Sequence, residues 1–376
     1  MKKTLLITSY FPPRKGGISN FLLNIFNSFD NDFFVLTDQF SASKTNNRII
    51  RFSFFSKIIW PRWLPLVYKI YKQIKLNNIE LLQAGQLIPI GTICYLLNKM
   101  IGIKYHVYVY GQDLLIARDS KRKTKIIHKV LKNADKIIAC SNYTKQLAVK
   151  NGANENNTIV VYPIPKNLKI ESLSPEQVNE FKKEKGLENR KVILSVGNLV
   201  KRKGQDMVIK SIAKIKQNNS NILYIIIGSG PNIDDLRKLI VRLDLVKYVK
   251  ILEHVTNEEL PIYYSVCDIF IMPSRYLRNN NNQPIDVEGF GMVFLEANLY
   301  GKPVIGGLVG GQIDAIEDNV SGYLVDPENL EKITEKIQLL LNNSELANEL
   351  GLAGKKRALE NFNWDIEIEK IKKIID

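Results

Sequence analysis

DVEGFGMVFLEANLYGKPVIGGLVGG, residues 286–311, is the stretch that decides the fold prediction. It contains two glutamates with seven residues between them. The apolar residues after Gly291 form helices readily, and no proline interrupts them before Pro303. Gly301 suits the end of a helix, and the proline suits the start of the next element. The pattern therefore predicts a helix between the two glycines, followed by a strand.

The same stretch carries groups that suit a nucleotide sugar. Gly289 and Gly291 have no side chains, so a ligand can approach the first helical turn, where backbone N–H groups have no intrahelical partner. Those donors and the positive end of the helix dipole favour a phosphate. Glu288 can accept a hydrogen bond from a neutral ligand group, and Glu296 from a pair of hydroxyls. The alternative is a half-buried helix in which Glu288 is an ordinary N-terminal acidic residue.

The glutamate pair around EGFG, the later GKPVIG and the GG before a predicted helix resemble a known family. It is family 4 (group 1) of the retaining nucleotide-sugar glycosyltransferases, which have the GT-B fold. The resemblance covers nearly the whole chain and is strongest from 267 to 327. It implies an α/β protein of two Rossmann-like domains, whose parallel sheets face each other across a cleft.

Length supports a division into two domains, because 376 residues exceed what one core usually spans. The resemblance implies an acceptor-binding domain at 1–165 and a nucleotide-sugar-binding domain at 166–359. Prolines and serines between 163 and 175 predict the linker. We expect the last helix, about 360–376, to pack back on the first domain through Phe362 and Trp364.

The chain is basic, with 53 Lys and Arg against 38 Asp and Glu and a net charge of +15. An excess of this kind favours an anionic partner: a nucleotide, a membrane surface or a nucleic acid. An AT-rich genome, which favours Lys, Asn and Ile, is the alternative explanation. No nucleic-acid-binding motif accompanies the charge, so we expect no nucleic-acid partner. The opening MKKTLLITSYFPP resembles a signal peptide only until its prolines, which predicts a cytoplasmic protein.

The three cysteines and three histidines are scattered and show no metal-ligand spacing. The cysteines are most simply buried small hydrophobic residues. We therefore expect no metal and no cofactor, with the nucleoside diphosphate sugar as co-substrate.

The first half alternates apolar strands with helical stretches, which predicts a parallel sheet covered on both faces. Its first unit is a strand at 5–8, a loop with Gly16 and Gly17, and a helix that Ser19 or Asn20 would cap. In the resembling family this loop lies over the donor phosphates and the acceptor. Further strands are predicted at 33–37, 79–85, 104–111, 135–141 and 157–163.

The predicted strand at 104–111 ends in Tyr110-Gly111-Gln112-Asp113, where ligands bind in sheets of this kind. The resembling family has His-Gly-x-Asp here, so Gly111 and Asp113 match and Tyr110 replaces a histidine that helps to hold the transferred sugar. A tyrosine hydroxyl can form hydrogen bonds but carries no positive charge. The resemblance places Asp113 among the catalytic residues and Tyr110 among the donor contacts.

The second half repeats the strand, glycine loop and helix plan from 191 onward. In the family this loop ends in an arginine and a lysine that grip the donor diphosphate. Lys203 matches the lysine, whereas Asn198 stands where the arginine is usual, and Lys201 or Arg202 is the candidate to compensate. Lys203 and Glu288 are thus the predicted catalytic residues of this half.

The resemblance implies further donor contacts in the second half. Gly228 and Gly230 end the strand that borders the nucleotide base, while the residues around the start of the later helix contact the sugar and diphosphate. Residues 277–285 are polar, which predicts a mobile loop. The donor-binding set of the second half is Asn198, Arg202, Lys203, Gly228, Gly230, Glu288, Phe290, Gly291, Met292, Val293 and Glu296.

Two segments, 48–75 and 117–132, mix basic with apolar residues. This mixture suits peripheral contact with an anionic membrane, at the inner face of the cell membrane. The alternative is a helix whose apolar stripe faces the core and whose basic side is solvated.

The resemblance implies a retaining, metal-independent transferase that moves a hexosyl-type sugar from a UDP- or GDP-sugar to a hydroxyl of a glycan or lipid-linked acceptor. Cell-surface polysaccharide or lipopolysaccharide synthesis is the expected setting. A catalytically inactive nucleotide-sugar-binding partner of another glycosyltransferase is the main alternative, supported by Tyr110 and Asn198. An epimerase would need further acid–base groups, and a phosphorylase would often need a lysine that binds a cofactor. The sequence also lacks the glycine fingerprint of a NAD-dependent enzyme.

Overall fold

The computed structural model describes residues 1–376 except 15, 40–46, 117–119 and 165–172. It divides into two compact units. Unit 1 comprises Met1–Lys166 and Asn363–Asp376, and unit 2 comprises Asn167–Phe362. Most of the predicted linker lies outside the described residues.

Unit 1 is built on a seven-stranded sheet in the order β3-β2-β1-β4-β5-β6-β7, and every strand pair is parallel. The alternating pattern had predicted this arrangement. Its strands are β1 (Thr4–Thr8), β2 (Phe33–Asp38), β3 (Ile49–Phe52), β4 (Leu81–Ala84), β5 (Lys104–Val109), β6 (Lys136–Ala139) and β7 (Thr158–Val160). The edge strand β3 was not predicted, because Arg48 and Arg51 interrupt its short apolar run.

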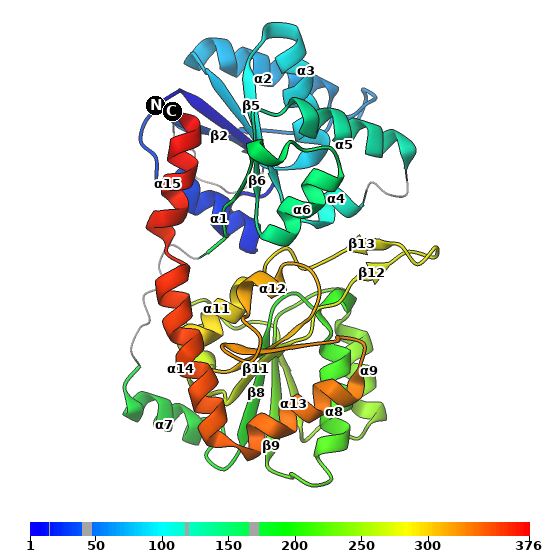
Figure 1. The fold of residues 1–376 in the computed structure, drawn as a ribbon, viewed down its shortest axis with the longest axis vertical. Coiled ribbons are helices and arrows are strands. Elements are labelled where there is room, and N and C mark those ends of the chain that lie inside the picture. Colours follow the sequence, from blue (N-terminus) through cyan, green and yellow to red (C-terminus); the bar gives the residue numbers. More distant parts are fainter. Residues whose placement is uncertain (15, 40–46, 117–119, 165–172) are drawn as a thin grey trace. The chain divides into compact units, whose positions relative to one another are not determined.

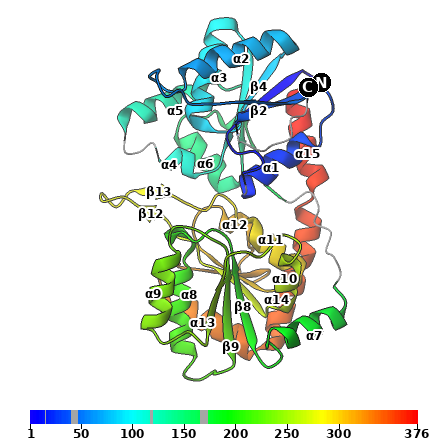
Figure 2. The same cartoon turned by 180° about the vertical axis from the view of Figure 1, so that it is seen from behind.

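Helices connect these strands, as Figures 1 and 2 show. The predicted cap of the first helix was wrong, because α1 begins directly after Gly16 and not at Ser19 or Asn20. Phe21, Leu22 and other apolar residues of α1 are buried. The helices of unit 1 are α1 (Gly17–Phe26), α2 (Leu64–Asn77), α3 (Thr92–Ile101), α4 (Gln112–Leu115), α5 (Lys121–Asn133), α6 (Asn142–Lys150) and α15 (Trp364–Ile375), with short turns η1 (Leu87–Gly91) and η2 (Glu155–Asn157).

The C-terminal helix α15 belongs to unit 1. The Trp364 ring packs edge-on against Phe21, with 6.2 Å between centroids, and its indole N–H donates to Ser28 Oγ at 3.2 Å. Both chain ends lie together in Figures 1 and 2, and the Met1 amino group is 3.6 Å from Asp376. Phe362, which was expected to share this packing, belongs to unit 2, where its ring lies 5.7 Å from that of Phe290.

Unit 2 is built on a six-stranded parallel sheet in the order β10-β9-β8-β11-β14-β15. Its strands are β8 (Lys191–Val196), β9 (Ile222–Ile227), β10 (Val249–Leu252), β11 (Ile269–Met272), β14 (Val304–Gly307) and β15 (Gly322–Val325). Its helices are α7 (Pro175–Glu184), α8 (Gln205–Ile215), α9 (Ile233–Arg242), α10 (Leu260–Val266), α11 (Met292–Leu299), α12 (Gln312–Ala315), α13 (Leu330–Asn342) and α14 (Ser344–Asn361), with the turn η3 (Lys201–Lys203). The core between the helices and the sheet is apolar, and every residue of β9 is buried.

The segment predicted as a mobile loop, 277–285, is instead a hairpin. Its strands β12 (Leu277–Arg278) and β13 (Pro284–Asp286) pair antiparallel. Asn282 adopts a positive φ of 60°, and its N–H donates to the Asn279 carbonyl at 2.9 Å. Asparagine tolerates this conformation, so the polar run forms a turn.

Among the described residues, no helix has the length and apolar character needed to cross a membrane.

Candidate functional site

The donor residues predicted in the second half of the chain gather at one edge of unit 2's sheet. The carboxyl ends of parallel strands meet at the same edge, so the loops after β8, β9 and β11 lie together there. Their backbones touch: a Cβ at Gly228 would lie 2.0 Å from the Gly197 carbonyl oxygen, and one at Gly204 would lie 2.2 Å from that of Pro273. The turn before α11 joins them through the side chain of Glu288.

Glu288 is the centre of this cluster, and only 12% of its side chain is exposed. Its Oε2 accepts from Lys203 Nζ at 2.5 Å, from Arg202 Nη1 at 2.8 Å and from Ser274 Oγ at 3.2 Å. Arg202 also donates from Nε to Asp286 Oδ2 at 3.1 Å. The structure thus brings together three residues that were predicted separately, and adds Ser274 and Asp286, which were not.

The protonation state of Glu288 follows from this geometry. Burial alone would raise the pKa of the carboxyl, but the charges of Arg202 and Lys203 and their hydrogen bonds outweigh burial and lower it to about 2. Glu288 is therefore an anion at neutral pH. Within the described residues, no hydrogen bond reaches its Oε1, so one oxygen remains to accept from a ligand hydroxyl while the other is held by cations.

Arg202, and not the loop position 198, supplies the second cation. Asn198 is exposed, and its backbone carbonyl accepts from the Gln205 side chain at 3.4 Å. Lys201 is also exposed. The guanidinium of Arg202 reaches the same carboxylate oxygen as Lys203, so the two cations lie within reach of one ligand group.

The helix predicted from the opening stretch is present as α11. Gly291 precedes it with φ +101°, and a Cβ there would lie 2.7 Å from the Phe294 ring. The Phe290 ring is buried and packs 5.7 Å from Phe362, so Phe290 offers a ligand mainly its backbone. The N–H groups of Met292 and Val293 occupy the first turn, where helices leave donors for a ligand.

The second glutamate of the pair, Glu296, lies within α11. Its Oε2 accepts from Tyr264 Oη at 2.6 Å. Burial raises the pKa of the Glu296 carboxyl, and the hydrogen bond from Tyr264 offsets only part of that rise. Glu296 is half-buried, so it can also accept from a hydroxyl of a bound ligand.

A buried glutamine ties the surrounding loops together and was not predicted from the sequence. Gln312 donates from Nε2 to the carbonyls of Ser274 at 2.9 Å and Val309 at 3.0 Å, and its Oε1 accepts from the Gly307 N–H at 2.9 Å. These bonds link the loop after β11 to the loop after β14. The only signal for Gln312 in the sequence was its position directly after Gly310 and Gly311, at the start of α12.

Gly228 and Gly230 shape the loop after β9. Their φ angles are +146° and +157°, and a Cβ at Gly230 would lie 2.5 Å from the Leu199 carbonyl oxygen. Both glycines thus allow this loop to lie directly on the loop that leads to Lys203. Their predicted contact with a nucleotide base stays a prediction.

The other predicted residues belong to unit 1. Gly16 and Gly17 lie at the start of α1. Gly16 has φ +138°, and no other described residue comes within 4 Å of the position that a Cβ would take there. Tyr110 and Asp113 follow β5, and the Tyr110 N–H donates to Asp113 Oδ1 at 3.0 Å. These residues follow β1 and β5, two central strands of the sheet, at their carboxyl ends.

Two buried polar atoms of this loop have no partner within the part of the chain that the structure describes. They are Tyr110 Oη and Asp113 Oδ2. Burial raises the pKa of Asp113 to about 6, although the backbone N–H groups of Tyr110 and Leu114 oppose the rise. Burial also raises the pKa of Tyr110 well above its usual range, so its hydroxyl stays neutral. Buried polar groups normally have partners, so this pair suits the hydroxyls of a ligand.

We expect Asp113→Asn to make the protein more stable at pH 7, by about 3 kcal/mol. A carboxyl whose pKa is raised on folding adds stability at low pH, which is lost as pH rises from its ordinary 3.8 through about 6. Asparagine carries no charge, so that loss should disappear. Urea unfolding from pH 3.5 to 7.5 measures it, with Asp135→Asn as the comparison, because the pKa of Asp135 is lowered. Equal pH profiles for wild type and Asp113→Asn would contradict the burial of an unpartnered charge.

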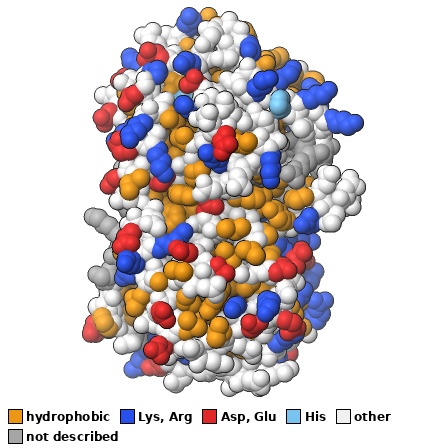
Figure 3. Space-filling model, viewed as in Figure 1, with side chains coloured by type: hydrophobic (Ala, Val, Ile, Leu, Met, Phe, Trp, Pro, Cys, Tyr) orange, Lys and Arg blue, Asp and Glu red, His pale blue; other side chains and the backbone are white. Residues whose placement is uncertain are grey.

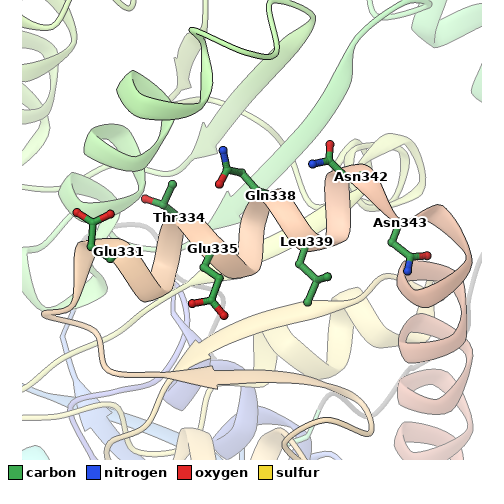
Figure 4. A pocket seen from close by; sticks show the side chains of 7 residues that line it. All are labelled: Glu331, Thr334, Glu335, Gln338, Leu339, Asn342 and Asn343. Carbon is green, nitrogen blue, oxygen red and sulfur yellow. The ribbon is translucent and has the colours of Figure 1, made fainter.

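Other parts of the described chain offer less. No group of three His, Cys, Asp or Glu residues is placed to hold a metal ion among the residues described. Asp30 and Asp32, an Asp-x-Asp pair, lie at the amino end of β2 and not at the ligand edge. Figure 4 shows the side chains that line a hollow along α13, which are acidic, amide and other uncharged groups without Lys or Arg. Its lining is Glu331, Thr334, Glu335, Gln338, Leu339, Asn342 and Asn343.

Comparison with known proteins places this chain among glycosyltransferases. Residues 177–357 match the family model described as "Glycosyl transferases group 1". The chain is 26% identical over 374 residues to a GDP-mannose-dependent alpha-(1-6)-phosphatidylinositol monomannoside mannosyltransferase of Mycolicibacterium smegmatis, covering 96% of this chain and 94% of the relative. It is also 31% identical over 281 residues to an uncharacterized 41.2 kDa protein in the cps region of Klebsiella pneumoniae. This match covers 71% of this chain and 70% of that protein.

A solved structure shares the fold of the whole chain. The structure of Anabaena Alr3699/HepE in complex with UDP and glucose superposes with a TM-score of 0.83, over 99% of both chains. Sequence identity is 20%, so this likeness concerns the fold.

Proposed function

Because the chain belongs to the glycosyl transferases of group 1 and has the GT-B fold, we propose that it is a retaining hexosyltransferase. Its donor is a UDP- or GDP-sugar, and its acceptor is a hydroxyl of a glycan or a lipid-linked sugar. One observation carries the proposal: Arg202 and Lys203 converge on Glu288 beside the first turn of α11. Two cations and helix N–H groups at the ligand edge suit a diphosphate whose charge grows as the sugar leaves.

The chemistry needs charge stabilisation more than a dedicated base. Lys203, Arg202 and the first-turn N–H groups of α11 stabilise the departing diphosphate, and they supply the positive charge without a metal. The leaving phosphate takes the acceptor proton on the face where the new bond forms. Glu288 holds a sugar hydroxyl through Oε1, while Glu296 accepts from the ribose. Asp113 and Tyr110 bind hydroxyls of the transferred sugar or of the acceptor.

Donor binding has to change the pairing in the cluster. Arg202 and Lys203 are matched by Asp286 and Glu288, so these four charges cancel. A diphosphate therefore gains little until it takes over N–H donors that now point at the carboxylates. Arg202 and Lys203 have more donors than the carboxylates use, so they can bridge both groups. Glu288 then serves to hold the two cations at the phosphate position.

GDP-mannose is the first donor to test. The mycobacterial relative is GDP-mannose-dependent and matches nearly the whole chain, whereas the likeness to the UDP complex rests on fold alone. That relative acts on a phosphatidylinositol mannoside, which favours a lipid-linked acceptor at the inner face of the cell membrane. The cps-region relative favours a role in cell-surface polysaccharide synthesis, with lipopolysaccharide as the other setting.

The second candidate is a catalytically inactive partner that binds a nucleotide sugar. Tyr110 in place of histidine and Asn198 in place of arginine favour it. Arg202 weakens the argument from Asn198, because its guanidinium donates to the same Glu288 oxygen as Lys203 and so supplies a second cation there. Transfer of labelled sugar to membrane extract separates the two functions, and the anomeric configuration of the product, read by NMR, tests retention.

We expect one nucleoside diphosphate to raise the melting temperature of the wild type, in a panel of UDP, GDP, ADP, CDP and NAD. A ligand at a hundred times its Kd adds about 2.7 kcal/mol of stability. Lys203→Ala should lose most of this shift, because it removes a charge-assisted bond to phosphate. Lys201→Ala is the matched control, since Lys201 lies in the same turn but is exposed.

Two results would count against the proposed site. The absence of a shift with every diphosphate would favour a lost donor site. An equal loss in Lys201→Ala and Lys203→Ala would mean that the charge of the turn, and not the position of Lys203, binds the ligand.

A further inference from the structure

The positive charge of the chain resides in unit 1. Lys and Arg outnumber Asp and Glu there by 28 to 12, a balance of +16, whereas unit 2 has 25 against 26, a balance of −1. An AT-rich genome would enrich lysine in both units alike, so base composition does not explain the difference. The excess calls for an anionic partner of unit 1 itself.

Large apolar side chains are exposed on the same unit. They come from the segment before α2 and from the outer side of that helix. In the segment, 95% of Ile58 and 76% of Trp60 are exposed, and on α2 69% of Tyr68 is exposed. The opposite side of α2 is buried through Leu66 and Ile70, so core packing already uses its other face. The predicted core stripe and the exposed apolar residues are therefore different residues.

A cationic hollow lies beside this apolar segment. It is lined by Lys121, Arg122, Lys125, Ile126 and Lys129 of α5. Figure 3 shows Lys and Arg side chains gathered over α5. The Arg122 guanidinium lies 6.0 Å from the centre of the Trp60 ring, which brings the hollow and the apolar segment together although they are distant in sequence.

Acidic residues are absent from the sequence of both parts. None occurs from 47 to 79 or from 120 to 134. Like-charged side chains gathered in this way repel one another, and a free surface gains nothing from holding them beside exposed Ile58 and Trp60. An anionic lipid bilayer satisfies both kinds of group, with phosphates against the cations and the interface against the apolar side chains.

We propose that unit 1 docks on anionic lipid bilayers through this surface, the α2–α5 surface. Ile58, Ile59 and Trp60 enter the interface, and Lys121, Arg122 and Lys125 bind lipid phosphates. The purpose of the docking rests on the proposed function, since it would bring a lipid-linked acceptor to the enzyme. The docking itself does not, because binding to vesicles needs neither donor nor acceptor. A nucleic acid fits less well, because Ile58 and Ile59 offer bases no stacking surface.

Vesicle co-sedimentation of the full chain tests the proposal. The vesicles are phosphatidylcholine alone and phosphatidylcholine mixed with phosphatidylglycerol. We expect the wild type to bind the mixed vesicles, and added salt to weaken binding. Arg122→Gln with Lys125→Gln should weaken it about 30-fold, since each cation near an anionic surface contributes about fivefold. Trp60→Ala should weaken it about tenfold, through lost apolar burial.

Matched controls come from unit 2. Lys238→Gln with Lys250→Gln removes two exposed cations, and Val246→Ala shortens a side chain that is 64% exposed. These variants should bind vesicles like the wild type. Equal weakening in the controls, equal binding to both kinds of vesicle, or no binding at all would overturn the proposal. A labelled oligonucleotide that binds more tightly than the vesicles and depends on the same residues would overturn it in favour of nucleic acid.

The nucleotide thermal-shift panel, repeated on Trp60→Ala and on Arg122→Gln with Lys125→Gln, separates this inference from the proposed function. Normal nucleotide shifts without vesicle binding would reject only the membrane surface. Vesicle binding without any nucleotide shift would reject only the donor site.

Discussion

Glu288→Gln is expected to reduce sugar transfer roughly 10²- to 10³-fold, the range for losing one preorganised charged or polar group at a reacting centre. Glutamine keeps the shape of the side chain and a hydroxyl acceptor, but it removes the charge that holds Arg202 and Lys203 in place. The two cations then lose the anion that fixes them at the diphosphate position. Initial rates at saturating donor, compared with nucleotide thermal shifts, separate lost transfer from lost binding.

The same substitution should lower the free energy of unfolding by about 3 kcal/mol at pH 7. Removing one partner of a buried ion pair leaves uncompensated charge, and only 16% of Arg202 and 11% of Lys203 are exposed. Glu331→Gln is the control, because Glu331 pairs with Lys214 on the surface and is 76% exposed. Its effect should stay below about 1 kcal/mol.

The stability that the Glu288 charge contributes should depend on pH in one direction. Folding lowers the pKa of Glu288 from its ordinary 4.5 to about 2, so the carboxylate contributes its full stability above pH 4.5 and loses it as pH falls toward 2. The difference between wild type and Glu288→Gln should therefore shrink over this range. A difference that stays constant from pH 6 to pH 2.5 would mean that the Glu288 charge is not what stabilises the cluster.

Local sequence was enough to predict most of the framework. The apolar strand predicted to end at Gly228 and Gly230 is the fully buried β9, which ends at Ile227, and Gly291 and Pro303 bounded α11 and β14 as expected. These predictions worked because they depend on neighbours in the chain. The strand β3 and the 277–285 hairpin were missed because arginines or asparagines hide the pattern there.

The candidate site was predicted only as separate residues. Lys203 was expected to grip a phosphate and Glu288 to meet a neutral group, yet their side chains contact each other across 85 positions of sequence. No spacing rule reports such a pair, because it depends on how β8 and α11 are brought together by the sheet. Ser274 and Gln312 were missed for the same reason. The unpartnered state of Asp113 Oδ2 also depends on burial, which the Gly-x-Asp motif alone does not specify.

Gly228→Ala is expected to lower the free energy of unfolding by about 4 kcal/mol, through a backbone clash and a strained φ. The new Cβ would lie 2.0 Å from the Gly197 carbonyl oxygen, and Gly228 has φ +146°. Real Cβ atoms do not approach so closely, so the loop after β8 has to move. That loop leads to Lys203, and the substitution should also weaken nucleotide binding.

Gly301→Ala is the control that separates the strain of a positive φ angle from the backbone clash expected in Gly228→Ala. Gly301 has φ +67° but nothing within 4 Å of the position of a new Cβ, so only the left-handed strain of about 1 kcal/mol applies. Urea unfolding gives both stabilities, and the nucleotide shift, measured well below each melting temperature, reports the state of the loop. Similar losses in the two variants, or a normal nucleotide shift in Gly228→Ala, would show that the loops after β8 and β9 do not lie in contact. In either case Gly228 would not set the position of Lys203.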